Sequence, residues 1–254
     1  MKTITDRHQF ILEKLKKEGK VNIIDLVEQM GVSGVTIRKD LKLLEDKSLL
    51  YRTHGGGSVH NPYATERLAD EKELVNSDEK RKIAKAANDL IDQAESIMIS
   101  SGTTAYEFAR ALHPAMQLTV ITPALKVALA LSNRPNIEVL QLGGLVRQNT
   151  SSVSGAHALQ ILKDISCNTL FMGVSGIDFD FGVSIAYLSE VALHQKMIET
   201  AQTVVILADS TKFDRRGLGR VCSLEQVQYI VTDNKISKNS IQALEDRGIK
   251  VIIA

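Results

Sequence analysis

The chain has 254 residues and a formal net charge of +1, so it is long enough for two domains and is neither strongly basic nor strongly acidic. No apolar run is long enough to span a membrane, the first residues lack the apolar core of a signal peptide, and the two cysteines lie far apart. These features argue against a membrane protein and a disulfide framework. We therefore expect a cytoplasmic protein that holds no metal and no cofactor.

The charge is unevenly distributed along the chain. Residues 1–58 carry 11 Lys and Arg against 8 Asp and Glu, whereas the remainder carries 20 against 22. The excess is modest, and a surface of balanced charge is an alternative interpretation. A protein that binds DNA with so small an excess has to gather its positive charge on one surface, and it gains from dimerisation.

Two amphipathic helices are predicted at the start of the chain, the first ending at Gly19 and the second running from the N-cap Asn22 to Gly31. Their apolar residues recur at helical spacing and are Phe10, Ile11, Leu12 and Leu15 in the first helix and Ile23, Leu26, Val27 and Met30 in the second. A short turn then leads to Ser33. Two helices around such a turn also occur in proteins that never bind DNA, so spacing alone leaves both interpretations open.

A third helix is predicted after Ser33, whose hydroxyl can accept a first-turn N–H. Ile37, Leu41 and Leu44 form its apolar side, and its other side is rich in Thr, Arg and Lys, as in a helix that reads a major groove. The stretch from Tyr51 to Gly57 resembles a short wing. We expect DNA contacts from Ser33, Thr36, Arg38, Lys39, Lys42, Arg52, His54 and Gly55.

The pattern changes between residues 58 and 77, where Asn61-Pro62 is followed by a charged run. We interpret this stretch as a linker between a winged helix-turn-helix domain at residues 1–57 and an effector-binding domain at residues 78–254.

The second domain alternates short apolar strands with helices. The predicted strands are Ser96–Ser100, Leu118–Thr122, Ile137–Leu142, Thr169–Gly173, Val204–Ala208, Tyr229–Thr232 and Lys250–Ile253. The predicted helices are Lys80–Ile91, Ala105–Leu112, Ala124–Leu131, Ala156–Ile165, Ser189–Ala201 and Lys238–Arg247. This alternation predicts an α/β fold with a mostly parallel sheet covered on both faces.

Ligands of such sheets bind beyond the carboxyl ends of the strands, and the polar residues of this domain concentrate there. Gly102 and the following helix start form a phosphate cradle in physical terms, because they offer free N–H groups and a partial positive charge. Each residue taken singly could equally be a turn, a cap or half of a surface pair. Together they favour a sugar phosphate, with candidate contacts from Ser101, Gly102, Thr103, Thr104, Thr122, Gly143, Gly144, Arg147, Gly176, Asp178, Glu190, Lys196, Asp209 and Lys212.

Residues 3 to 58 resemble the winged helix-turn-helix of the DeoR/GlpR family of bacterial transcriptional regulators. The motifs that carry the resemblance are Ser33-x-x-Thr36-Ile37-Arg38-Lys39-Asp40-Leu41, Leu44-Glu45 and Arg52-x-His54-Gly55-Gly56. Lys39 stands where the family usually has a second Arg, which keeps the charge and loses the bidentate fork.

Residues 62 to 254 resemble the effector domain of the same family, which implies a Rossmann-like sheet similar to that of ribose-5-phosphate isomerases. The motifs are Ser101-Gly102-Thr103-Thr104, Leu142-Gly143-Gly144, Ser154-Gly155, Phe171-Met172-Gly173, Gly176-Ile177, Glu190 with Lys196-Met197, Ala208-Asp209, Lys212-Phe213 and Thr232-Asp233. The resemblance implies a repressor of carbohydrate genes that binds a DNA operator and a phosphorylated sugar. A homodimer or homotetramer is expected, because one small head makes too few DNA contacts.

The alternative is a sugar-phosphate isomerase with an attached DNA-binding domain. Asp178, Glu190, Lys196 and Asp209 could supply acid-base groups for such a reaction. The Asp-Gly-Ala-Asp-Glu run of the isomerases is missing, and the corresponding stretch begins at Gly176 and continues Ile-Asp-Phe-Asp-Phe. We therefore expect a regulator that is not an enzyme.

Overall fold

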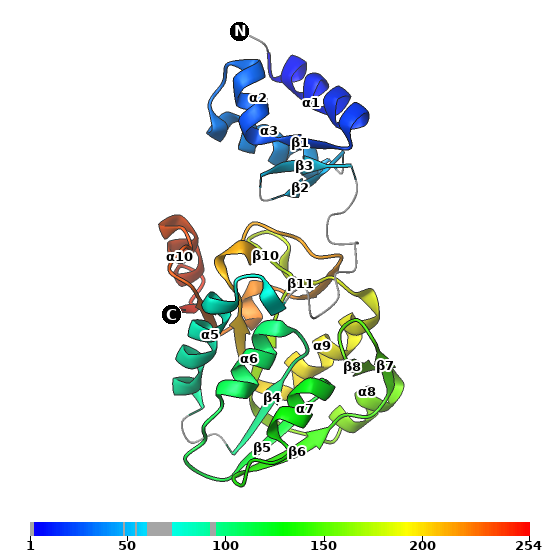
Figure 1. Ribbon diagram of the computed structural model, residues 1–254, viewed down its shortest axis with the longest axis vertical. Helices are drawn as coiled ribbons and strands as arrows, with labels where there is room; N and C mark the ends of the chain where they lie inside the picture. The colour runs from blue at the N-terminus through cyan, green and yellow to red at the C-terminus, as the bar shows by residue number, and fades with distance from the viewer. Residues whose placement is uncertain (1–2, 48, 54, 60–72, 92–94) are drawn as a thin grey trace. The chain divides into compact units, whose positions relative to one another are not determined.

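The computed structural model of the chain describes residues 3–47, 49–53, 55–59, 73–91 and 95–254. The chain divides into two compact units, residues 1–66 and 67–254 (Figure 1). The first has one hydrophobic core and the second has two among the described residues. In the part of the chain that the structure describes, no helix is both long enough and apolar enough to cross a bilayer.

The first unit packs helices against a small antiparallel sheet. Its elements are α1 (Ile4–Glu18), β1 (Lys20–Asn22), α2 (Ile23–Met30), α3 (Gly34–Asp46), β2 (Tyr51–Thr53) and β3 (Gly56–Ser58). The strand order is β1-β3-β2, so β2 and β3 form the wing and β1 closes its other side. The three helices were predicted, whereas β1 was not, because three residues between two helices carry too short a pattern.

Local capping explains where these helices begin and end. The Asn22 side chain accepts from the N–H of Ile24, and the Ser33 hydroxyl accepts from the N–H of Thr36, which confirms both predicted N-caps. Gly19 and Gly31 adopt left-handed conformations at the ends of α1 and α2, as glycine does at helix ends.

Gly56 marks the tightest backbone approach in this unit. A Cβ at Gly56 would lie 1.7 Å from the carbonyl oxygen of Val21, so the pairing of β3 with β1 requires glycine at this position. A Cβ at the neighbouring Gly55 would meet no atom within 4 Å.

The second unit is built on a parallel sheet of seven strands in the order β15-β14-β12-β9-β4-β5-β6. The strands are β4 (Ser96–Ile99), β5 (Leu118–Thr122), β6 (Ile137–Gln141), β9 (Cys167–Gly173), β12 (Ala201–Leu207), β14 (Tyr229–Thr232) and β15 (Lys250–Ile253). The helices are α5 (Ser77–Ala87), α6 (Thr103–Ala111), α7 (Leu125–Leu131), α8 (Ala156–Leu162), α9 (Leu188–Thr200) and α10 (Lys238–Glu245), with short 3₁₀ turns at Asn88–Leu90, Ser210–Lys212 and Leu224–Gln226. The predicted α/β class is therefore confirmed.

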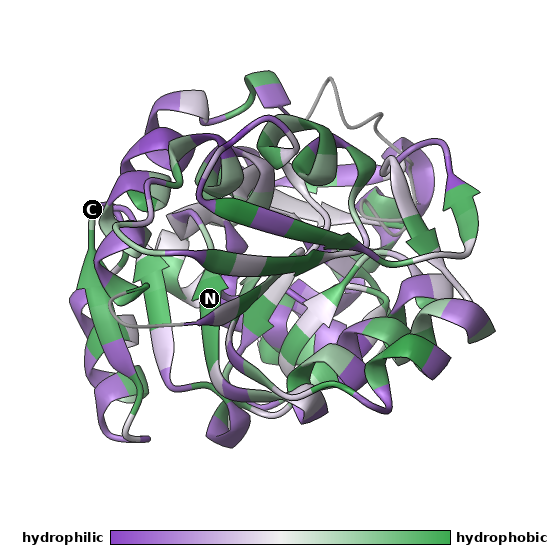
Figure 2. Ribbon diagram, turned by 90° about the horizontal axis from the view of Figure 1, so that it is seen from below, coloured by the Kyte–Doolittle hydropathy of each residue, from purple (hydrophilic) through white to green (hydrophobic). Residues whose placement is uncertain are grey.

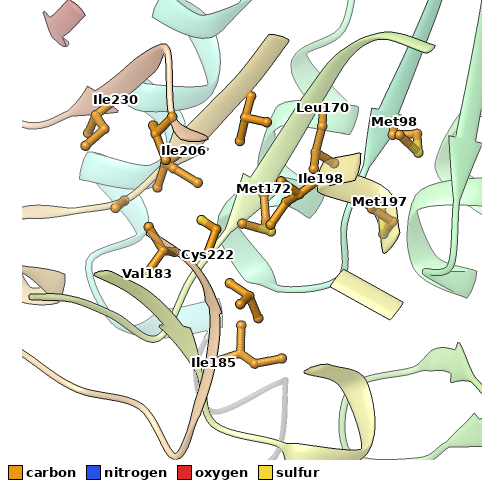
Figure 3. Packing of buried hydrophobic residues seen from close by; sticks show 14 of the residues in the cluster. Met98, Leu170, Met172, Val183, Ile185, Met197, Ile198, Ile206, Cys222 and Ile230 are labelled. Carbon is orange, nitrogen blue, oxygen red and sulfur yellow. The ribbon is translucent and has the colours of Figure 1, made fainter. Parts of the chain in front are cut away.

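Side chains of alternate strand residues enter two separate cores. Met98 and Met172 pack with α8, α9 and α10 on one face of the sheet (Figure 3), whereas Ile99 and Phe171 pack with α5, α6 and α7 on the other. The Phe171 ring stacks on that of Phe108 at a centroid distance of 4.2 Å. Burial on both faces accounts for the mostly hydrophobic strands, while the helices also carry hydrophilic residues (Figure 2).

Two small antiparallel elements beside the main sheet were missed from sequence. One is the hairpin of β7 (Leu145–Arg147) and β8 (Ser152–Ser154), and the other is the sheet of β10 (Gly176–Asp178), β11 (Gly182–Ile185) and β13 (Gly219–Cys222). Gly176–Asp178 follows β9 in the chain and forms a strand of its own, which pairs with β11, and β11 in turn pairs with the distant β13.

Replacing Gly56 by Ala should lower the free energy of unfolding of the first unit by about 1–3 kcal/mol, as overpacking against a fixed backbone does. Calorimetry of Gly56→Ala and of the matched control Gly55→Ala tests this, and the control should stay within about 0.5 kcal/mol of wild type. Equal unfolding temperatures for the two variants would contradict the close approach of Gly56 to Val21.

Candidate functional site

The outer face of α3 is the candidate DNA-reading surface. Arg38, Lys39 and Lys42 are exposed on it, and Val35 is 73% exposed beside them. The Thr36 hydroxyl lies 2.9 Å from the Ser33 hydroxyl, so both polar groups sit at the start of the helix. The predicted contacts on α3 therefore share one accessible surface, which combines cations with a small apolar group of the kind that contacts a thymine methyl.

A buried ion pair holds α3 against α1. Asp40 is 1% exposed and accepts two hydrogen bonds from the guanidinium of Arg7, at 2.6 Å from Nε and 3.0 Å from Nη2. The Asp40 hydrogen bonds raise the pKa of Arg7, so the guanidinium stays charged. His8 Nε2 lies 3.3 Å from the same carboxylate. Sequence reasoning missed this group, although an acidic residue on the apolar side of a predicted helix signals a buried partner.

The wing is tied to the same helix. The Arg52 backbone N–H donates to Glu45 Oε1 at 2.8 Å, and its guanidinium Nη1 lies 3.9 Å from Glu45 Oε2. The carbonyl of Gly55 accepts from the N–H of Ile23 at 2.7 Å, so this residue also joins the wing to α2. His54 lies outside the described residues.

In the second unit, the loop between β4 and α6 lies at the carboxyl edge of the sheet. Gly102 has φ +115° and precedes α6, where the first helical carbonyl contact is from Tyr106 N–H to Gly102 O at 2.9 Å. The amides of Thr103 and Thr104 precede that bond and therefore lie in the first turn. The Ser100 hydroxyl accepts from Gly173 N–H and donates to Ser101 O, fixing the loop against β9. The loop thus presents helix N–H groups from a rigid backbone.

The loops after β5 and β6 contribute fewer polar groups that could bind a ligand at this edge. The Thr122 hydroxyl is buried, donates to Ile99 O at 2.7 Å and accepts from Ala124 N–H, so it serves the backbone. Gly143 is exposed next to Gly144, and a Cβ at Gly144 would lie 2.6 Å from Ser154 O. Thr122 therefore stabilises the backbone by hydrogen bonds, and Gly144 allows the close approach of the backbone at Ser154.

Glu190 and Arg147 lie where the β7–β8 hairpin meets the start of α9. Glu190 is 4% exposed and accepts hydrogen bonds from the hydroxyls of Thr150 at 2.8 Å and Ser152 at 3.0 Å. Arg147 donates to the Ser189 hydroxyl at 3.2 Å, and its guanidinium stacks 3.9 Å from the Tyr187 ring centroid. Both predicted residues are thus part of one polar junction.

Asp178 pairs with a residue that sequence reasoning did not single out. Arg216 contacts both of its carboxylate oxygens, at 3.0 Å and 3.1 Å, and the N–H groups of Asp180 and Phe181 donate to it as well. Burial raises the pKa of Asp178, but these hydrogen bonds outweigh burial and leave the pKa below its ordinary value. A Cβ at Gly176 would lie 2.4 Å from Arg215 O. Gly176 therefore allows the backbone of residue 215 to pass close to β10, and Asp178 binds the side chain of Arg216 beside it.

Asp209 lies at the end of β12 and is 1% exposed. Its Oδ1 accepts from the backbone and hydroxyl of Thr211 and from Asn76 Nδ2, while Lys212 occupies the same 3₁₀ turn. Lys196 is elsewhere. It lies in the second half of α9, next to the amino end of β12, and pairs with Glu199 at 3.2 Å. The structure thus brings Asp209 and Lys212 to the carboxyl edge and leaves Lys196 away from it.

Neither cysteine offers a nucleophile. Burial raises the pKa of the Cys222 thiol to about 12 and also raises that of Cys167. Among the described residues, no group of three or more His, Cys, Asp and Glu side chains could hold a metal ion.

Comparison with known proteins identifies both halves of the chain. Residues 7–62 match the DeoR-like helix-turn-helix domain, and residues 75–234 match the DeoR C terminal sensor domain. A protein of Escherichia coli O157:H7 named as an aga operon transcriptional repressor is 33% identical over 251 residues, covering 98% of this chain and 93% of its own length. The glycerol-3-phosphate regulon repressor of Escherichia coli K12 is 29% identical, covering 97% and 98%.

Among solved structures, ribose 5-phosphate isomerase A of Methanocaldococcus jannaschii is similar with a TM-score of 0.39 at 18% identity, covering 54% of this chain and 55% of that one.

Replacing Asp178 by Asn removes the ion pair with Arg216 and should lower the free energy of unfolding at pH 7. The loss should be only about 1 kcal/mol, because solvent screens the partly exposed Arg216. A depressed folded pKa contributes stability that is present above the ordinary value of 3.8 and is lost as the pH falls through the folded value. Urea unfolding at pH 7 and pH 3 should therefore show a difference that shrinks at the lower pH. The exposed Asp164→Asn control should show no such trend, and a difference that is constant with pH would contradict the pairing.

Proposed function

The chain belongs to the DeoR family of transcriptional regulators, and we propose that it represses genes of carbohydrate metabolism under the control of a phosphorylated sugar. The observation that carries the proposal is a pair of separate surfaces in one chain. One is the cationic outer face of α3, and the other is the rigid Gly102 loop at the carboxyl edge of the parallel sheet. The first suits duplex DNA and the second suits an anionic ligand.

On the DNA side, Arg38 and Lys39 are the base-reading or phosphate-binding candidates at the exposed start of α3, with Lys42 one turn on. Arg52 would approach the phosphate backbone from the wing. One head of this size makes few contacts, so we propose that a dimer or tetramer in the cytoplasm binds a repeated or palindromic operator.

On the effector side, the proposed contacts centre on Ser101, Gly102, Thr103 and Thr104, with Asp209 and Lys212 at the neighbouring strand end. A phosphate group would accept hydrogen bonds from the helix start, and the sugar hydroxyls would bond to carboxylate and hydroxyl groups. The relative named for glycerol 3-phosphate supports a phosphorylated effector.

We propose a sensor that does not turn its ligand over. Three of the candidate acid-base groups have structural partners: Asp178 pairs with Arg216, Glu190 accepts two hydroxyls, and Lys196 pairs with Glu199. An isomerase needs such groups beside the substrate carbon. Conversion of ribose 5-phosphate by the purified protein in the absence of DNA would favour the alternative enzyme.

Regulation requires the effector to bind the DNA-competent and DNA-incompetent conformations with different affinity. A coupling of about 1–3 kcal/mol would change operator affinity roughly 5- to 150-fold.

Arg38→Ala should weaken binding of the best duplex selected from a random pool by about 1–3 kcal/mol, and it should relax specificity at one base position. Fluorescence anisotropy against the selected duplex and a scrambled duplex measures both effects. Lys163→Ala removes an exposed cation from the other unit and serves as the control. Wild-type protein that bound both duplexes equally would contradict base reading by Arg38.

Gly102→Asp should abolish effector binding, because its carboxylate would occupy the phosphate position. A melting-temperature screen of sugar phosphates, with an external dye because the chain has no tryptophan, identifies the ligand in wild type. A true effector at 100 times its dissociation constant should stabilise the protein by about 2.7 kcal/mol. Gly102→Ala shares the backbone strain at φ +115° without the charge, and it should retain more of the response. Full effector binding by Gly102→Asp would exclude the loop as the phosphate site.

A further inference from the structure

Residues 73–76, which end in a turn and lead into α5, are tied to the start of α7 and to the loop after β12. Glu73 Oε1 lies 2.7 Å from Lys126 Nζ near the start of α7, and Asn76 Nδ2 donates to Asp209 Oδ1 at 3.3 Å beyond β12. Asn76 adopts a left-handed conformation with φ +53°, which asparagine enters more readily than most other residues that have a side chain. We call residues 73–76 the entry turn.

The two ties lie on either side of the candidate phosphate loop. In the sheet, β9 and β4 separate β12 from β5, so the two anchored strands are about 14 Å apart. The intervening strand ends are those that lead to Gly102 and to Gly173. The entry turn is therefore fixed on both flanks of the place where the effector is proposed to bind.

Lys126 links the entry turn to α6 directly. Its Nζ lies 5.9 Å from the centroid of the Tyr106 ring, and Tyr106 N–H bonds to the carbonyl of Gly102. α6 packs beside α5 and α7 in the same layer (Figure 1). Tyr106 follows Gly102 by four residues, so the ring that Lys126 covers belongs to the turn of α6 that begins at the Gly102 loop. The flexible four-carbon side chain of Lys126 lets its ammonium move relative to that ring.

We propose that Lys126 is a cation shared between Glu73 and the bound phosphate, and that phosphate binding releases the entry turn. This inference rests on the proposed function. The phosphate carries a charge of about −1.5 to −2 at pH 7 against −1 for the carboxylate, so it attracts the ammonium more strongly. Lys126 and Glu73 are 35% and 29% exposed, and an ion pair so open to water exchanges partners readily.

The exchange would connect ligand binding to the chain that leads to the DNA-binding unit. The entry turn is the first described part of the second unit after residues 60–72. Its second tie, Asp209, is itself a proposed effector contact, so hydroxyls of the ligand would compete with Asn76 for the same carboxylate. Occupancy of one site would therefore loosen both restraints on the entry turn.

Hydrogen exchange of the full-length protein tests the proposal with ribose 5-phosphate and inorganic phosphate as probes. In wild type, either probe should speed amide exchange in residues 73–80. Glu73→Gln should exchange faster without any probe and bind the probes about two- to fivefold more tightly, since the charge of Glu73 no longer competes with the phosphate for Lys126. Lys126→Met should also exchange faster without probe, and it should bind the probes several-fold more weakly.

The matched control is Asp78→Asn, which breaks the exposed pair with Arg81 one turn into α5 and should change neither probe affinity nor the response to it. Probes that bind wild type at the Gly102 loop without changing exchange in residues 73–80 would overturn the shared cation alone. A Glu73→Gln variant with wild-type probe affinity would do the same. Wild-type protein that bound no phosphorylated probe would overturn the effector class and this inference together.

Discussion

The second unit depends on the burial of a parallel sheet on both faces. Successive residues of β4, β9 and β12 enter opposite cores, so a slip of one residue would exchange the side chains of the two cores and disturb the close packing of both. Because the seven strands are parallel, the loops that follow them all begin at the same edge of the sheet. The polar residues of these loops therefore lie at one edge of the sheet, and the Gly102 loop and Asp209 share that edge for this reason.

Many polar groups of the second unit stabilise the protein itself. Thr122 bonds to backbone, Asp178 to Arg216, and Glu190 to two hydroxyls of the β7–β8 hairpin. Each of these groups thus has a hydrogen-bond partner within the protein.

The sequence predicted features whose causes are local and failed where the causes are distant. Gly31 and Ser33 mark a helix end and a helix start through their own backbone and side chain, and the alternation of apolar strands and helices predicted the parallel sheet. By contrast, Arg216 reaches Asp178 across 38 positions and Asn76 reaches Asp209 across 133. The spacing of apolar residues along a helix or strand does not reveal pairs of residues so far apart in the sequence. Asp40 is intermediate, since its place on an apolar helix side called for a partner without identifying Arg7.

The Arg7–Asp40 pair has a consequence for how ionic strength acts on the first unit. Mobile ions screen exposed charges over about 10 Å at 0.1 M, but they act less on this bidentate pair, whose Arg7 and Asp40 side chains are 13% and 2% exposed. Added salt therefore weakens the attraction of α3 for phosphates while the orientation of α3 on α1 persists. A salt titration of this protein reports the number of counterions displaced from the duplex, undisturbed by loosening of the head that displaces them.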